Sequence, residues 1–216
     1  MFDLYVVTDS SLSKGRSDVE IARMAYEGGA DAVQLRMKHA GDEEMLDAAL
    51  KIKEIADDMN RFFFVNDNVK VAKESEADGV HIGQDDMPIA QAREILGDMA
   101  IIGVSVNNVE QAVAAVNGSA DYVGVGSIFH TNTKPDAEQS LGLGAIYDIS
   151  RAVDVPIVAI GGINRGNIQD VIRAGADSAA VVSAVVAQDD VRAAAHELRD
   201  LILKVRPHVP PEDLNI

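Results

Sequence analysis

The sequence predicts an α/β fold with one closed barrel of parallel strands, and three observations support this prediction. Short runs rich in Val and Ile alternate with longer helix-like segments along the whole 216-residue chain. There are eight such runs, and parallel strands buried on both faces need helical crossovers. A small residue followed by Asp recurs four times between a helix and the next strand, which indicates a doubled strand–helix unit. Eight strands connected in this way close into a (β/α)8 TIM barrel.

The expected strands are short, whereas the segments between them place apolar residues at helical spacing. The strands are Leu4–Thr8, Ala32–Leu35, Phe62–Val65, Gly79–Ile82, Ile101–Val106, Tyr122–Ile128, Pro156–Ile160 and Ser178–Val182. Within Glu44–Met59, the residues Met45, Ala49 and Ile52 fall on one helical face. The last helix, Val191–Val205, repeats the pattern, so we expect each helix to cover the barrel with its apolar side.

Four aspartates mark the connections into the second, fourth, sixth and eighth strands, and they are Asp31, Asp78, Asp121 and Asp177. In each repeat the small residue closes the helix and the Asp opens the turn into the strand. A six-stranded doubly wound sheet is the competing fold, but no Gly-x-Gly-x-x-Gly follows the first strand. No linker divides the chain, so we expect one barrel domain over residues 1–206 and a tail over 207–216.

The composition excludes several classes of protein. The chain has 19 Lys and Arg against 35 Asp and Glu, a net charge of −16 that repels polyanions, so we expect no nucleic-acid or anionic-membrane partner. It has no Cys, which excludes disulfides and Cys-ligated zinc. The first residues lack a basic segment and no run of 18 apolar residues follows, so we expect a cytoplasmic protein. The oligomeric state stays open, with a homo-oligomer among the alternatives.

The carboxyl ends of the expected strands carry unusual polar residues, and active sites of such barrels form at that end. After the second strand, Gln34, Arg36 and Lys38 share one face by the period of two, which predicts an anion site; surface cations are the alternative. Asp67 and Asp86 follow the third and fourth strands, where two carboxylates suit Mg²⁺. The alternative is that Asp85 or Asp86 caps the helix that starts near Pro88.

The remaining strand ends indicate a second anion site. Ser105 ends the fifth strand, and two hydroxyls, an amide and a Lys lie within Thr131–Lys134 of a long loop. Gly162 and Ser183 follow the last two strands, where barrels of this class often bind phosphate through backbone N–H groups. We expect His81 to pack inside its strand and His130 to be exposed. Two anion sites and a metal indicate a reaction that joins a diphosphate ester to a phosphorylated acceptor.

These motifs, taken together, resemble the thiamine-phosphate synthase (thiamine-phosphate pyrophosphorylase) family, and they follow the family's order across nearly the whole chain. The matching strings are Tyr5-Val-Val-Thr-Asp9, Gln34-Leu-Arg-Met-Lys38, Phe64-Val-Asn-Asp67, Asp78-Gly-Val-His-Ile-Gly-Gln-Asp-Asp86, Ile102-Gly-Val-Ser105, Asp121-Tyr-Val-Gly-Val-Gly126, Thr131-Asn-Thr-Lys134, Ala159-Ile-Gly-Gly-Ile163 and Val181-Val-Ser183. The resemblance implies a TIM-barrel transferase that couples hydroxymethylpyrimidine diphosphate to a thiazole phosphate and releases diphosphate. It also implies Mg²⁺ and a dissociative mechanism.

The same resemblance implies roles for individual residues. It implies that the pyrimidine diphosphate is held by Gln34, Leu35, Arg36, Met37, Lys38, Asn66, Ser105 and Lys134, of which Arg36, Lys38, Ser105 and Lys134 are the catalytic residues. It implies that Asp67 and Asp86 bind Mg²⁺. It implies that the thiazole phosphate is held by Thr131, Asn132, Thr133, Gly162, Val182 and Ser183.

Two features of the sequence depart from the family pattern or leave an alternative open. Ser127 and His130 replace the two prolines that the family usually has before its Thr-Lys motif. A thiazole isomerase of the related tautomerase type, which would use His130 and no metal, is one alternative function. A non-catalytic ligand sensor on the same barrel is another.

Overall fold

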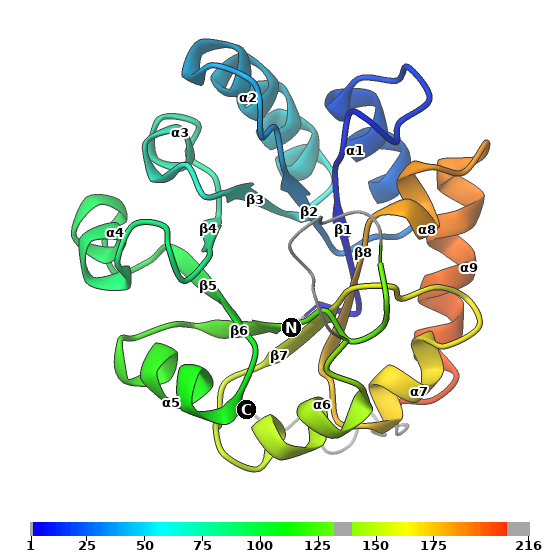
Figure 1. Cartoon of the computed structure of the whole chain (residues 1–216). Coiled ribbons are helices and arrows are strands. Elements are labelled where there is room, and N and C mark those ends of the chain that lie inside the picture. The colour runs from blue at the N-terminus through cyan, green and yellow to red at the C-terminus, as the bar shows by residue number, and fades with distance from the viewer. Residues whose placement is uncertain (1, 132–139, 207–216) are drawn as a thin grey trace, which may run out of the picture.

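Eight parallel strands close into a barrel in the computed structural model, which describes residues 2–131 and 140–206 (Figure 1). Neighbouring strands pair in chain order, and β8 pairs with β1 to complete the ring. The strands are β1 (Leu4–Val7), β2 (Ala32–Leu35), β3 (Phe62–Asn66), β4 (Gly79–Ile82), β5 (Ile101–Val106), β6 (Tyr122–Val125), β7 (Ile157–Ile160) and β8 (Ser178–Val181). The predicted TIM barrel is therefore confirmed, and the six-stranded alternative is wrong. The expected tail over 207–216 lies outside the described residues.

Helices follow the strands and lie outside the ring (Figure 1). They are α1 (Asp18–Glu27), α2 (Asp42–Asp58), α3 (Val69–Glu74), α4 (Ile89–Leu96), α5 (Val109–Asn117), α6 (Leu143–Ser150), α7 (Ile168–Arg173), α8 (Ser183–Val186) and α9 (Val191–Leu203). Several begin at a side chain that accepts a backbone N–H of the first turn, such as Ser17 of α1 and Asn108 of α5. Within the described ranges, none of them has the length and apolar content needed to cross a membrane.

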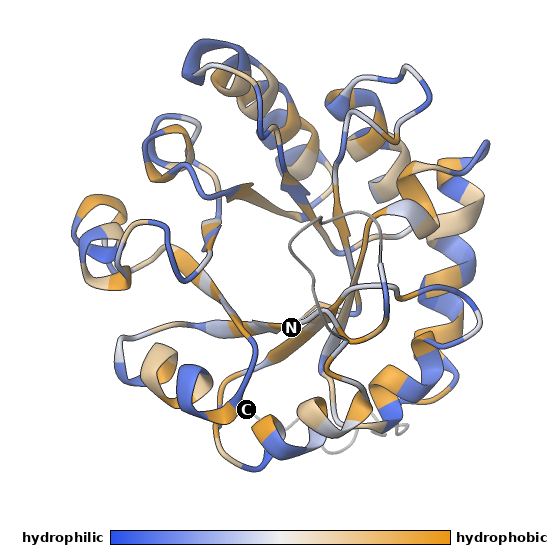
Figure 2. Ribbon diagram, in the orientation of Figure 1, coloured by the Kyte–Doolittle hydropathy of each residue, from blue (hydrophilic) through white to orange (hydrophobic). Residues whose placement is uncertain are grey.

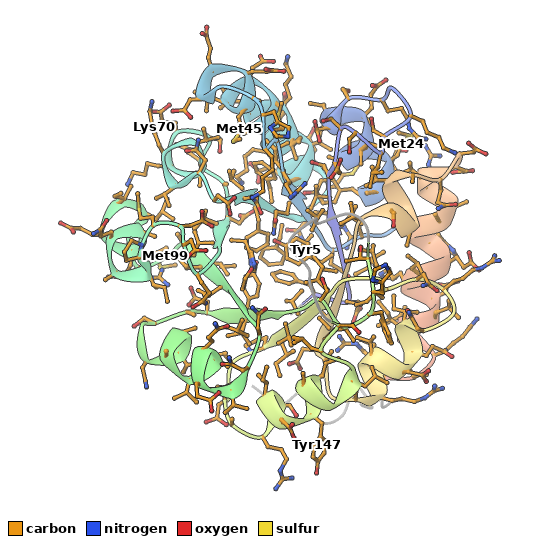
Figure 3. All side chains as sticks on the ribbon, in the orientation of Figure 1. Tyr5, Met24, Met45, Lys70, Met99 and Tyr147 are labelled. Carbon is orange, nitrogen blue, oxygen red and sulfur yellow. The ribbon has the colours of Figure 1, made fainter. Side chains whose placement is uncertain are left out.

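The apolar core has two parts, one outside the ring of strands and one inside it. Outward-facing side chains of the strands meet the apolar faces of the helices, whose other faces are hydrophilic (Figure 2). Inside the ring, the rings of Phe2, Tyr5, Phe64 and Tyr122 pack at centroid distances of 5.4–6.4 Å. Tyr5 lies within the ring, whereas Lys70 and Tyr147 lie at the periphery (Figure 3). The interior of the barrel is therefore filled by side chains, as expected for this fold.

The sixth strand ends earlier than the sequence predicts. It stops at Val125, not Ile128, although the N–H groups of Ile128 and Phe129 still donate to the carbonyls of Ile160 and Gly161. A Cβ on Gly126 would lie 2.3 Å from the Ile160 carbonyl oxygen, so the two segments approach more closely than a side chain allows. The chain thus stays beside β7 after it leaves the ladder.

The four repeated aspartates join strands in pairs at the amino end of the barrel. The N–H of each Asp donates to the carbonyl of a residue in the preceding strand, and its Oδ2 accepts the N–H of that same residue. The partners and distances are Asp31 with Leu4 (3.0 and 3.1 Å), Asp78 with Phe63 (3.0 and 2.7 Å), Asp121 with Ile102 (2.8 and 2.7 Å) and Asp177 with Ile157 (2.9 and 2.8 Å). Each carboxylate satisfies a backbone N–H at the start of a strand, which would otherwise be buried without a partner.

We expect Asp177→Ala to lower the free energy of unfolding by about 1–3 kcal/mol, because the N–H of Ile157 loses its acceptor. Asp177→Asn retains a side-chain oxygen and should lose less. Asp47→Ala removes the same charge from an exposed pair with Lys51 and serves as the matched control. Denaturant unfolding of the three variants measures the difference; equal losses in Asp177→Ala and Asp47→Ala would contradict the assignment.

Candidate active site

A cavity of about 310 Å³ opens at the carboxyl ends of the strands and brings together most of the predicted site residues. Those that line it are Gln34, Arg36, Lys38, Asn66, Asp67, Asp86, Ser105, Thr131, Gly162, Val182 and Ser183. They come from the second to the eighth strand and the loops that follow, so residues far apart in the sequence share one hollow. Asn132, Thr133 and Lys134 lie outside the described residues.

Leu35 and Met37 lie apart from the other members of the predicted pyrimidine-diphosphate set. The Leu35 side chain is fully buried in the layer between strands and helices, and Met37 packs against that layer. Both face away from the barrel interior, as the period of two along β2 requires. Gln34 and Arg36, on the opposite face, reach the cavity.

Arg36 is held from both sides by residues that follow β1. Its backbone N–H donates to Thr8 Oγ1 at 3.1 Å, and its Nη1 donates to Asp9 Oδ2 at 3.0 Å. Ser11 donates its backbone N–H to the other Asp9 oxygen at 3.0 Å. A charge-assisted bond to a buried carboxylate fixes the direction of the guanidinium. The prediction did not include Asp9, although it follows a strand end like the residues that were chosen.

A second buried carboxylate contacts Thr8, which also binds the backbone of Arg36. Asp18, the first residue of α1, bonds to Thr8, and its Oδ1 has no hydrogen-bond partner in the described part of the chain. Burial raises the pKa of Asp18 above its ordinary value, and the charges of Asp9 and Glu44 act in the same direction. The segment that holds Arg36 therefore includes one buried carboxylate, Asp9, and contacts a second, Asp18, through Thr8.

Two further carboxylates meet beside Lys38. Its Nζ donates to Asp67 Oδ2 at 3.2 Å. Burial raises the pKa of Asp67, and a hydrogen bond and charge repulsion from Asp86 raise it further, whereas Lys38 lowers it. A divalent cation would relieve this repulsion, and Mg²⁺ commonly takes one or two carboxylates with water and phosphate oxygens. The two oxygen donors therefore fit Mg²⁺, although no group of three or more acidic, His or Cys ligands occurs in the described ranges.

The alternative role of Asp85 or Asp86 as a helix cap is wrong. Helix α4 begins after Pro88 with no side-chain cap, and Asp86 Oδ2 instead accepts the N–H of Gly83 at 2.7 Å. This bond turns the carboxylate back toward the end of β4. Asp67 takes a left-handed backbone conformation (φ 61°) directly after β3, which accompanies the sharp turn of the chain there.

Another part of the cavity rim is formed by the loops after β6, β7 and β8. Gly162 has φ 65°, and a Cβ on it would lie 2.6 Å from the carbonyl oxygen of His130. This glycine lets the β7 turn pack directly against the β6 loop that carries Thr131. His130 itself is exposed, as predicted. Val182 and Ser183 complete the rim, and because β8 pairs with β1 and β1 pairs with β2, this end of the rim lies two strands from the strand that precedes Arg36 and Lys38.

Three side chains that the prediction left out of the site form its floor. Tyr5, His81 and Tyr122 line the cavity between Gln34 and Ser105. The signal that could have found the two tyrosines is their position in strands that are buried on both faces, because a buried phenol needs a hydrogen-bond partner.

Comparison with known proteins identifies this arrangement. A family model described as thiamine monophosphate synthase matches residues 4–185, a range that includes every site residue discussed above. The chain belongs to the thiamine monophosphate synthase family. It is 52% identical over 199 residues to the thiamine-phosphate synthase of Chloroflexus aurantiacus, covering 92% of both chains. It is 48% identical to that of Methanoculleus marisnigri, covering 93% of this chain and 95% of the relative.

A solved structure supports the same assignment. The thiamine phosphate pyrophosphorylase from Pyrococcus furiosus superimposes with a TM-score of 0.88 at 43% identity, covering 94% of this chain and 96% of that one. The resemblance that the motifs indicated is therefore confirmed. The protein is a thiamine-phosphate synthase by family, and hence a transferase that acts on small molecules.

We expect Asp18→Asn to stabilise the protein at neutral pH. The pKa of Asp18 is higher in the folded than in the unfolded protein, so its ionisation opposes folding. The folded protein is therefore more stable while Asp18 is protonated, and this extra stability is lost as the pH rises through the folded-state pKa. Asparagine mimics the neutral acid, so the melting temperature of Asp18→Asn should exceed that of the wild type by more at neutral pH than at acidic pH. Melting temperatures at several pH values measure it.

Asp189→Asn is the matched control for this experiment. Asp189 is exposed, and its pair with Lys14 lowers its pKa, so ionisation of this residue favours the fold. The control should therefore show no gain at neutral pH. A pH-independent effect of Asp18→Asn would show that burial of its charge is not the cause.

Proposed function

We propose that the cavity binds the pyrimidine diphosphate beside β2, β3 and β4, and the thiazole phosphate beside the loops after β6, β7 and β8. The observation that carries this proposal is the uneven distribution of charge around the cavity. Two cations (Arg36 and Lys38) and three carboxylates (Asp67, Asp85 and Asp86) line one part of the rim, and the glycine-rich part after β6, β7 and β8 has no cationic side chain among its described residues. Two phosphorylated substrates placed in this way have their reacting groups between these two parts of the rim.

The diphosphate end of the site depends on Arg36 and Lys38. Their side chains are 21% and 46% exposed, so both are accessible to a ligand although each already has a carboxylate partner. Asp67 and Asp86 would hold Mg²⁺, which supplies charge neutralisation for a diphosphate leaving group. Lys134, together with Asn132 and Thr133, joins the proposal through the family resemblance alone.

The proposed reaction is dissociative. The C–O bond between the pyrimidinylmethyl carbon and the diphosphate breaks, and both electrons leave with the diphosphate. The resulting cation is captured by the lone pair of the thiazole nitrogen, which forms the new C–N bond. Arg36 and Lys38 stabilise negative charge that develops on the departing oxygen. The strands and loops that surround the reacting groups limit capture of the cation by water.

A coupled assay with and without Mg²⁺ tests the proposal. We expect thiamine phosphate and diphosphate from the two substrates with Mg²⁺, loss of activity with a chelator, and recovery when Mg²⁺ is restored. Asp67→Asn should raise the Mg²⁺ concentration for half-maximal rate by about 10-fold or more, because it removes one anionic ligand. Calorimetric titration with Mg²⁺ measures the same loss without turnover.

Asp47→Asn, which removes an exposed carboxylate, is the control and should leave the Mg²⁺ dependence unchanged. An unchanged Mg²⁺ dependence in Asp67→Asn would remove Asp67 from the metal site. Conversion of the thiazole phosphate alone, without the pyrimidine diphosphate, would instead favour the isomerase alternative.

A further inference from the structure

A continuous chain of hydrogen bonds crosses the floor of the cavity from Gln34 to Ser105. Gln34 Nε2 donates to the Tyr5 hydroxyl at 2.9 Å, and the hydroxyls of Tyr5 and Tyr122 are 3.2 Å apart. The Tyr122 hydroxyl is 2.9 Å from His81 Nδ1, and His81 Nε2 is 2.9 Å from Ser105 Oγ. Four strands, β1, β2, β4 and β6, supply the first four members, and β5 supplies Ser105. We call these five residues the floor chain.

Glycines in the neighbouring strands make room for the floor chain. A Cβ on Gly103 would lie 2.0 Å from Tyr122 Cζ, and a Cβ on Gly124 would lie 2.7 Å from His81 Cε1. Neither glycine has a left-handed backbone, so the space for the two rings is the reason for a glycine at each position. Tyr5 and Tyr122 are 1% and 2% exposed, which fixes both phenols in place.

The floor chain has a direction. Burial raises the pKa of both tyrosines, so each keeps its one hydroxyl hydrogen. Tyr5 already accepts from Gln34, and its own hydrogen is therefore donated to Tyr122. Tyr122 then donates to His81 Nδ1, and because that ring nitrogen accepts, Nε2 carries the ring hydrogen and donates it to Ser105 Oγ. In this direction one of the two Gln34 amide hydrogens is used within the floor and orients the side chain, and the Ser105 hydroxyl hydrogen remains for a ligand.

We propose that Tyr5, Tyr122 and His81 are positioning residues that fix the polarity of the pyrimidine subsite, with Gln34 offering a carbonyl acceptor and Ser105 a hydroxyl donor. This inference rests on the proposed function of the cavity. A ring that presents an N–H donor toward Gln34 and an acceptor nitrogen toward Ser105 matches the polarity. An aminopyrimidine has both groups side by side, whereas an oxopyrimidine exchanges them for a carbonyl acceptor and a ring N–H donor.

Tyr122→Phe tests the proposal because it removes one oxygen and keeps the ring that fills the floor. Without that oxygen, the hydrogen of Tyr5 is left to Gln34, whose amide must rotate to accept it, and His81 Nδ1 loses its donor. We expect the preference for a 4-aminopyrimidine over the matching 4-oxopyrimidine, measured by calorimetric binding, to fall by about 10-fold. The KM for the pyrimidine diphosphate should rise by a similar factor, whereas the KM for the thiazole phosphate should not change.

Tyr26→Phe is the matched control. Tyr26 is 3% exposed and its hydroxyl donates to the carbonyl of Phe62 at 2.8 Å, but it lies on α1 outside the cavity. It therefore loses a buried hydroxyl without touching the floor chain, and it should keep the wild-type amino-to-oxo preference. Tyr5→Phe interrupts the chain at its second member, and it should reproduce the effect of Tyr122→Phe if that variant does not fold.

The outcomes separate the two proposals. An amino-to-oxo preference that is the same in Tyr122→Phe, Tyr5→Phe and Tyr26→Phe overturns the role of the floor chain, as does a wild-type protein without any preference. A wild-type protein that prefers the aminopyrimidine, loses the preference in Tyr122→Phe, and yet forms no thiamine phosphate overturns the proposed reaction while supporting the floor chain.

Discussion

The reciprocal bonds of Asp31, Asp78, Asp121 and Asp177 are the constraint on which the barrel depends. Each holds a strand to its neighbour through both a donated and an accepted hydrogen bond at the same residue, which leaves one register for that pair. Register decides which side chains enter the barrel, since a shift of one residue would turn each strand over. The positions of Gln34, Arg36 and Ser105 at the far end of the strands therefore follow from contacts at the near end.

The electrostatics of the mouth differ from those of the molecule as a whole. The net charge is −16, yet Arg36 and Lys38 face the cavity, each beside a carboxylate. At physiological ionic strength the screening length is about 8 Å, so distant surface carboxylates contribute little to the field within the hollow. A small phosphate ester at the mouth would meet Arg36 and Lys38, whereas a polyanion would meet the acidic exterior. We therefore expect the net charge to disfavour polyanions without excluding small anions from the cavity.

The sequence was sufficient to predict the fold from its periodicity, and the position of residues at strand ends, together with the family resemblance, predicted most of the charged residues that line the cavity. It was not sufficient for contacts that depend on the register between strands. Tyr5 and Tyr122 are separated by 117 positions, and no local pattern indicates that their hydroxyls meet. The local pattern at Asp86 was also ambiguous, since its place before Pro88 left a helix cap open as an alternative, whereas its carboxylate accepts the N–H of Gly83. The position of Arg36 in the site was predicted, but its ion pair with Asp9 was not.

The four aspartate contacts determine which parts of this chain can vary in sequence without loss of the barrel. Each carboxylate bonds within its own pair of strands, so each quarter of the barrel contains the bond that closes it. The opposite end shows no such repetition: cations follow β2, carboxylates follow β3 and β4, and glycines follow β7. The contacts that hold the strands in register and the side chains that line the cavity therefore lie at opposite ends of the same strands. The loops at the mouth can diversify while the four modules beneath them continue to assemble by one rule.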